Sequence, residues 1–131
     1  MRRDFSLIEE DLDFLKNLGL QWETVRCTSG NWVVLHDHPV PSGYNIPSVT
    51  LALKIDAGYP VSQIDMVYFF PALSLLSGSA IAALTPVQID GKNWQRWSRH
   101  RTGENPWRPG LDNIATHIQM VNFWLERELN K

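Results

Sequence analysis

The first eighteen residues alternate apolar and polar positions with the period of an α-helix. Apolar residues recur there at spacings of three and four: Phe5, Ile8, Leu12, Leu15 and Leu18. This spacing places them on one face, which predicts a helix over residues 5–18. Ser6 and Glu9 have the spacing of a capping box at its start, and Gly19 is typical of the residue that ends a helix.

A pattern of period two follows and predicts β-strands. It is clearest in the segment 48–56, where four apolar residues alternate with more polar ones: Val49, Leu51, Leu53 and Ile55. Such alternation is typical of a strand with one buried face. Residues 32–36 and 64–70 are also expected to form strands, and residues 81–89 a fourth short strand or an irregular crossing. Because turns separate these segments, we expect an antiparallel meander.

The rest of the chain divides into a segment without a clear period, 91–110, and a second helical pattern, 111–129. One face of this helix is apolar and contains Ile114, Ile118, Val121 and Leu125. Asp112 is expected to cap it. The predicted order is a helix, three or four strands, a long loop and a helix. Helices segregated from the strands indicate the α+β class, and we expect one such domain over residues 1–131.

The composition is that of an ordinary globular protein. Hydrophobic residues make up 44% of the 131 residues and charged residues 20%, which argues against a disordered chain. Lys and Arg number 12 against 14 for Asp and Glu, so a dedicated nucleic-acid-binding module is disfavoured. The longest apolar stretch, 69–84, is too short and too interrupted to span a membrane. No signal peptide is evident, and we expect a cytoplasmic location.

Several short motifs together resemble the ubiquitin-conjugating enzyme fold. The segment 51–60 is similar to the third strand and the Tyr-Pro turn of that family, and 64–70 falls where its fourth strand follows. The segment 107–109, Trp-Arg-Pro, resembles the Trp-x-Pro that precedes the family's long helix. This resemblance covers nearly the whole chain. It implies an N-terminal helix, a four-strand meander, a long active-site loop and a helix packed on the sheet, without the family's last two short helices.

A narrower resemblance is to a prokaryotic branch of this superfamily. It rests on the segments 43–45 (Gly-Tyr-Asn) and 58–60 (Gly-Tyr-Pro) and on the run 94–101, Trp-Gln-Arg-Trp-Ser-Arg-His-Arg. The resemblance implies three partners: a ubiquitin-like protein, an activating enzyme and a deubiquitinase-like protease of the same pathway. It implies no cofactor, and neither nucleic acid nor a membrane is an expected partner.

Two departures from the family concern the active site. The His-Pro-Asn motif is missing, since the one His-Pro pair, His38-Pro39, lies before the second expected strand. The nucleophilic cysteine that the family carries ahead of its Trp-x-Pro is also missing. Cys27 lies far upstream, between the first helix and the first expected strand, and is interpreted as a packing or incidental residue. Counting back from Trp107, the equivalent place falls near Ser98 to Arg99, and Ser98 is the only nucleophile there.

Ser98 is therefore the candidate acceptor, and its hydroxyl would carry the tail of a ubiquitin-like protein as an oxyester. A hydroxyl is barely ionised at neutral pH, so it needs a base within ~2.6–3.2 Å. His100 is that candidate base, because residues two apart in an extended segment point to the same side. The arginines nearby are suited to an oxyanion or a carboxylate. The predicted partner-binding residues are Trp94, Arg96, Trp97, Arg99, Arg101 and Trp107.

Three other interpretations stay open or are disfavoured. The chain can be a catalytically inactive module that binds the ubiquitin-like protein or the activating enzyme without a covalent bond. It can also bind single-stranded nucleic acid, with Trp94 and Trp97 stacking on bases. A metal site is disfavoured because His36 and His38, expected on one face of a strand, lack a third ligand. Asp65 is interpreted as a solvated strand cap.

Overall fold

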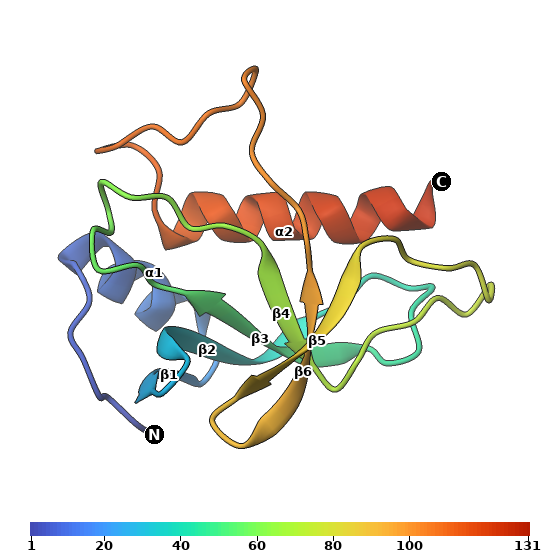
Figure 1. Ribbon diagram of the computed structural model, residues 1–131, viewed down its shortest axis with the longest axis horizontal. Helices are drawn as coiled ribbons and strands as arrows, with labels where there is room; N and C mark the ends of the chain where they lie inside the picture. Colours follow the sequence, from blue (N-terminus) through green and yellow to red (C-terminus); the bar gives the residue numbers. More distant parts are fainter.

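The chain folds as two helices and one six-stranded sheet, and the computed structural model describes all residues, 1–131 (Figure 1). The helices are α1 (Glu9–Leu18) and α2 (Ile114–Leu129). The strands are β1 (Trp22–Cys27), β2 (Gly30–Pro39), β3 (Ser48–Lys54), β4 (Val67–Phe70), β5 (Leu84–Ile89) and β6 (Lys92–Trp97). All strands lie between the two helices in sequence, so the α+β class is confirmed. Neither helix has the length and apolarity that a membrane crossing requires.

The sheet is antiparallel throughout, in the order β1-β2-β3-β4-β6-β5. The expected four-strand meander is therefore wrong in strand number and partly wrong in topology. Strands β1 to β4 do form a meander, but β6 inserts between β4 and β5. Pro86 lies in β5, the strand at one edge of the sheet, where a missing backbone N–H breaks no ladder inside the sheet.

Strands β1 and β6 were not predicted, because both faces of the sheet are covered and their sequences therefore lack apolar–polar alternation. In β1, Trp22 packs into the main core while Val25 packs on the opposite face. In β6, Trp97 and Trp94 divide between the faces in the same way. Apolar residues three apart on a strand point to opposite sides, so the sequence lacks the expected alternation. The predicted loop over 91–110 is thus corrected: its first part is a strand.

Strands β5 and β6 form a hairpin whose turn is Asp90-Gly91. Asp90 has a φ of 50° and Gly91 a φ of 81°, both in the left-handed region that a two-residue hairpin turn of type I′ requires. Asn, Asp and Gly adopt this region most easily. An Asp-Gly pair between two short strands is therefore a signal that local sequence carries for this hairpin.

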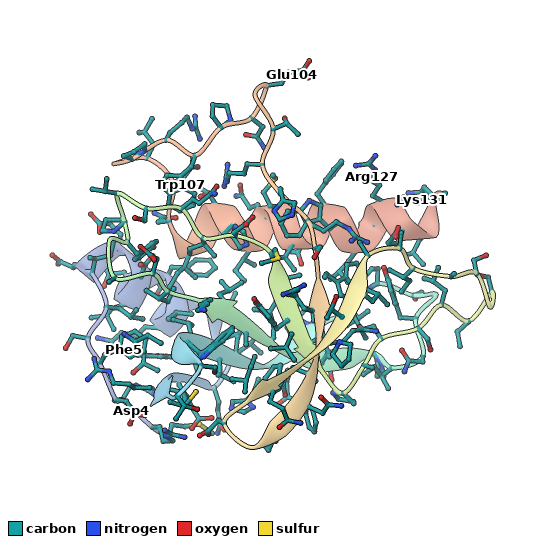
Figure 2. The ribbon with its side chains drawn as sticks, viewed as in Figure 1. Asp4, Phe5, Glu104, Trp107, Arg127 and Lys131 are labelled. Carbon is teal, nitrogen blue, oxygen red and sulfur yellow. The ribbon has the colours of Figure 1, made fainter.

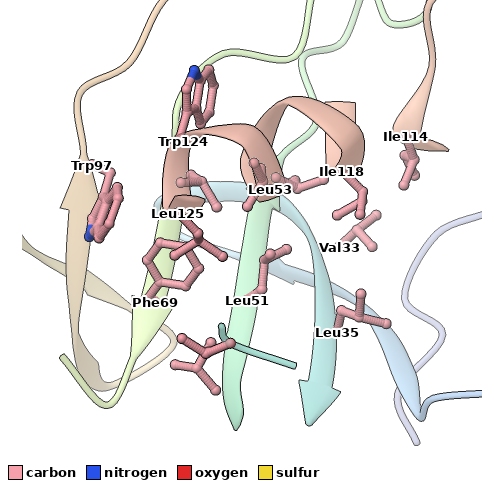
Figure 3. Close-up of a cluster of buried hydrophobic side chains, with 14 of the residues drawn as sticks. Val33, Leu35, Leu51, Leu53, Phe69, Trp97, Ile114, Ile118, Trp124 and Leu125 are labelled. Atoms are coloured by element: carbon pink, nitrogen blue, oxygen red, sulfur yellow. The ribbon is translucent and has the colours of Figure 1, made fainter. Parts of the chain in front are cut away.

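The main hydrophobic core lies between α2 and one face of the sheet. Figure 3 shows side chains of the central strands facing those of α2: Val33, Leu35, Leu51, Leu53, Phe69 and Trp97 against Ile114, Ile118, Trp124 and Leu125. All of these are buried. The predicted apolar face of the C-terminal helix is confirmed, since its residues Ile114, Ile118, Val121 and Leu125 belong to this core.

The opposite face of the sheet is concave and has a small core of its own. Seven buried residues form it: Val25, Trp32, Val34, Ala52, Tyr68, Ile89 and Trp94. The two ends of the sheet approach each other across this face, because Arg2, beside β1, forms an ion pair of 2.5 Å with Asp90 of the β5–β6 turn. The N-terminal residues also pair with the outer edge of β1 through a bridge between Arg3 and Thr24. The sheet therefore curls into a partly closed barrel.

The N-terminal caps of both helices differ from the sequence prediction. Helix α1 begins at Glu9, later than expected, and its cap residue Ile8 makes no side-chain cap, so the capping box at Ser6 is wrong. Gly19 ends this helix in the left-handed conformation, as predicted. Helix α2 is capped by Asn113, which forms a capping box with Thr116.

Candidate functional site

Ser98 comes directly after β6 and is tied to two neighbouring segments. Its backbone N–H donates to the carbonyl of Ala83, at 3.1 Å. Its hydroxyl is half-buried and lies 3.7 Å from the Sδ atom of Met66, a weak acceptor. The Met66 N–H donates in turn to the carbonyl of Arg99. Ser98 therefore has a fixed backbone and a hydroxyl without a strong hydrogen-bond partner.

His100 is held by the carboxylate of Asp65, a residue that the sequence analysis interpreted as a solvated strand cap. Its Nδ1 atom lies 3.0 Å and 3.1 Å from the two carboxylate oxygens of Asp65, in the segment before β4. The imidazole is 61% exposed, and Nε2 has no hydrogen-bond partner within the protein. A carboxylate on Nδ1 fixes the tautomer in which Nε2 is an acceptor, the form a general base needs. The structure has no hydrogen bond between Ser98 and His100, although both lie in the same short segment.

A cavity of about 370 Å³ is lined in part by the residues that contact Ser98 and His100. It is lined by Lys54, Asp56, Ser62, Gln63, Asp65, Met66 and Tyr68. Asp65 contacts His100 and Met66 contacts Ser98, so both candidate residues lie one contact away from this cavity. Most of its lining residues are polar or charged, which suits an extended peptide segment with polar backbone groups.

Arg99 fastens this segment to the end of α2. Its guanidinium donates to the carbonyl of Ala82 at 3.0 Å and to the Glu128 carboxylate at 3.2 Å. It also lies over the ring of Trp97, at 5.0 Å from the ring centroid. Glu128 is nearly buried, so the ion pair is shielded from water. The Arg99 guanidinium is therefore occupied within the protein.

Arg101 has a similar structural role on the loop that follows. Only 6% of its side chain is exposed, and the guanidinium lies 3.6 Å from Asp112 and 5.0 Å from the Trp107 ring centroid. Burial acts to raise the pKa of Asp112, but hydrogen bonds from the Arg108 side chain and backbone outweigh it and lower that pKa to about 2. Asp112 thus holds the loop through Arg101 and Arg108. It is not the helix cap that the sequence predicted, since Asn113 caps α2.

Trp107 anchors the far end of this loop. Its indole N–H donates to the carbonyl of Pro60 at 3.0 Å. Next to it, the Tyr59 hydroxyl donates to Asp11 of α1 at 2.6 Å, and the first N–H of α2, on Ile114, donates to the same carboxylate at 3.1 Å. Figure 2 shows the loop running out to Glu104 and back to Trp107, beside the start of α2.

Trp94 and Arg96 lie on the concave face, away from the main core. Trp94 is buried in the second core, and the Arg96 guanidinium reaches Thr85 of β5 at 3.4 Å. Trp94 is only 6% exposed and Trp97 0%. Trp97 is closed to any base, so the single-stranded nucleic-acid interpretation, in which both rings stack on bases, loses the pair of exposed rings that motivated it.

Cys27 lies at the other end of β6 from Ser98. It ends β1, close to Ser29 and to the backbone of Asp90, and the six residues of β6 separate that turn from Ser98 by ~20 Å. The expectation that Cys27 lies between two elements is wrong, because it is the last residue of β1. Burial acts to raise the pKa of its thiol, but hydrogen bonds involving Ser29 lower it overall.

His36 and His38 point to opposite faces of β2, contrary to the expectation that they share one. A register shift lies between Leu35 and His38, and Asp37 there has a φ of 56°. His36 pairs with Glu23 on the concave face, at 2.7 Å, while His38 contacts Asn122 of α2, at 2.8 Å. No group of three or more His, Cys, Asp or Glu side chains is arranged to hold a metal ion.

Comparison with known proteins identifies the family. No curated protein and no solved structure matches the chain. A family model described as prokaryotic E2 family E matches residues 7–128, which covers α1, the whole sheet, the Ser98–Trp107 segment and nearly all of α2. The chain therefore belongs to the prokaryotic E2 family E, a family of E2-like proteins whose class points to a role related to ubiquitin-like conjugation.

Proposed function

We propose that this protein receives the C-terminal tail of a ubiquitin-like protein from an activating enzyme and holds it as an oxyester on Ser98. The observation that carries the proposal is the pairing of His100 with Asp65, two residues beyond the only nucleophile at the place where the related conjugating enzymes have cysteine. A carboxylate-oriented imidazole is an arrangement that activates hydroxyl nucleophiles.

The chemistry is an acyl transfer in which the base must reach the hydroxyl. The Ser98 oxygen bonds to the terminal carbonyl carbon of the tail, and the bond from that carbon to the leaving group on the activating enzyme breaks. His100 takes the hydroxyl proton and returns it to the leaving group. Ser98 donates to a sulfur, which is a weak acceptor, so turning its hydroxyl towards His100 costs little. The cavity beside Asp65 and Met66 is proposed to accept the tail.

The test is an adduct assay with the ubiquitin-like protein, the activating enzyme and ATP. We expect an adduct that survives thiol reductant and is cleaved by mild base, and mass mapping is expected to locate it on Ser98. Ser98→Ala should abolish it, His100→Gln should slow its formation by ~10²-fold or more, and Cys27→Ala should leave it unchanged. An adduct that persists in Ser98→Ala would refute the assignment.

The second candidate is a non-catalytic module that binds the same partners. It is favoured by the direction of the Ser98 hydroxyl, which meets Met66 and not His100, and by the engagement of Arg99 and Arg101 in internal ion pairs. It predicts binding of the ubiquitin-like protein or the activating enzyme, measured by calorimetry, with no adduct under any condition. A deubiquitinase-like protease of the same pathway remains a proposed third partner.

A further inference from the structure

The mouth of the curled sheet contains a second cavity, which the proposed function does not use. Its volume is about 330 Å³, near the lower end of the range for small-molecule sites. Strands β1 to β4 and the β5–β6 hairpin contribute to its wall, at the end of the sheet where Arg2 contacts Asp90. The mouths of β-barrels are common places for such sites, and the curling of this sheet gives the cavity its depth.

Most charged groups of the wall are already paired with one another. Glu23 accepts from His36 and from the backbone N–H of Arg2, at 2.7 Å and 3.1 Å. Asp90 is neutralised by the Arg2 guanidinium. Lys92 is different, because no carboxylate lies within ion-pair distance of it. Its ammonium group lies 5.3 Å from the ring centroid of Phe70.

The remaining surface of the cavity is mainly apolar and aromatic, with one hydroxyl. Phe70 and Trp94 line it with their ring centroids 5.6 Å apart, together with Val34 and Ile89. Thr50 adds a hydroxyl to the wall.

We propose that this cavity binds a small aromatic carboxylate, with its ring against Phe70 and Trp94 and its carboxylate on Lys92. One unpaired ammonium and one hydroxyl complement a single negative charge. A phosphate would call for several unpaired cations or a cluster of backbone N–H groups, whereas Arg2 and His36 of this wall are already paired with carboxylates. The cavity lies on the concave face at the opposite end of β6 from Ser98, so the site is separate from the proposed conjugation chemistry.

The test compares two matched probes, 1-naphthaleneacetate and its neutral amide, 1-naphthaleneacetamide. Calorimetry should show saturable binding of the acid and at least 10-fold weaker binding of the amide. Changes in ¹H–¹⁵N chemical shifts should centre on the residues around Thr50, Phe70 and Lys92. Lys92→Gln should weaken the acid about 10-fold and leave the amide within 2-fold, which removes the preference for the anion.

Lys54→Gln is the matched control, because Lys54 also lies over an aromatic ring on this face, 5.8 Å from the Trp32 centroid, but lines the other cavity. It should leave binding of the acid unchanged. The proposal is overturned if the acid does not saturate, if the amide binds as well as the acid, if the shift changes lie elsewhere, or if both lysine variants weaken binding equally. None of these readouts depends on an adduct at Ser98.

Discussion

His117 makes the stability of this protein depend on pH in a way that can be calculated from its surroundings. It lies on α2, is 1% exposed, and its Nε2–H donates to the carbonyl of Met66 at 2.8 Å. Its Nδ1 atom is buried without a partner, so a second proton there would gain no hydrogen bond. Burial, assisted by the nearby Arg101, lowers the pKa of His117 from 6.5 to about 4, against the hydrogen bond to Met66.

The sign of the effect follows from which state binds the proton. Between pH 6.5 and pH 4 the unfolded chain protonates this histidine and the folded chain does not, so the free energy of unfolding falls as the pH falls. The two pKa values differ by about 2.5, and each pH unit is worth ~1.4 kcal/mol, so the loss approaches ~3 kcal/mol across this range. This is a large share of the ~5–15 kcal/mol that stabilises a typical domain.

The assay is urea denaturation followed by tryptophan fluorescence at several values between pH 7.5 and pH 4.5, on the wild type and on His117→Gln. The variant should be less stable at pH 7.5, because the packing around residue 117 changes. Its stability should then fall less on acidification, so the two curves converge towards pH 4.5. The buried His38, whose pKa burial also lowers, contributes equally to both proteins. Parallel curves over the whole range would refute the reasoning.

Two further predictions concern the contacts that hold the loop and the helices together. Tyr59→Phe removes the hydroxyl that donates to the buried Asp11 carboxylate, and should reduce the free energy of unfolding in urea by about 1–3 kcal/mol at pH 7; a change within ±0.3 kcal/mol would contradict the role given to this contact. Asp112 has a pKa lowered to about 2, so its contribution is complete above pH 3.8 and is lost as the pH falls towards 2. Asp112→Asn should therefore be about 1–2 kcal/mol less stable at pH 6 and approach the wild type by pH 2.5, which thermal unfolding at each pH would check.

The helices and strands β2, β3 and β4 could be predicted, because α2 and β3 have one dominant buried face and the apolar residues of β2 and β4 form short continuous runs. The apolar stripe of α2 and the alternation in β3 are strong local patterns, and the structure buries both against the main core. Strands β1 and β6 could not be found in the same way, because their large apolar residues serve both faces of a sheet that has two cores. The Asp90-Gly91 turn is the local signal that would have indicated β6.

The candidate site could be predicted only where its residues are neighbours in sequence. Ser98 and His100 are two residues apart, and both lie after β6. Their partners Met66 and Asp65 come from the segment before β4, and that pairing depends on β4 lying beside β6. Arg99 and Arg101 were candidate ligands for a partner because their internal carboxylates, Glu128 and Asp112, are distant in sequence. Long-range ion pairs of this kind have no local signature.

The protection of both sheet edges has a consequence for how this protein behaves at high concentration. An uncovered strand edge can recruit the same strand of another molecule and start ordered polymerisation. Here the N-terminal residues occupy the rim of β1 through the Arg3–Thr24 bridge, and Pro86 deprives the rim of β5 of one donor. These two features disfavour edge-to-edge pairing between the sheets of two molecules. They matter because the 24 residues from Met66 to Ile89 carry no charge, so charge repulsion between molecules does not protect this segment.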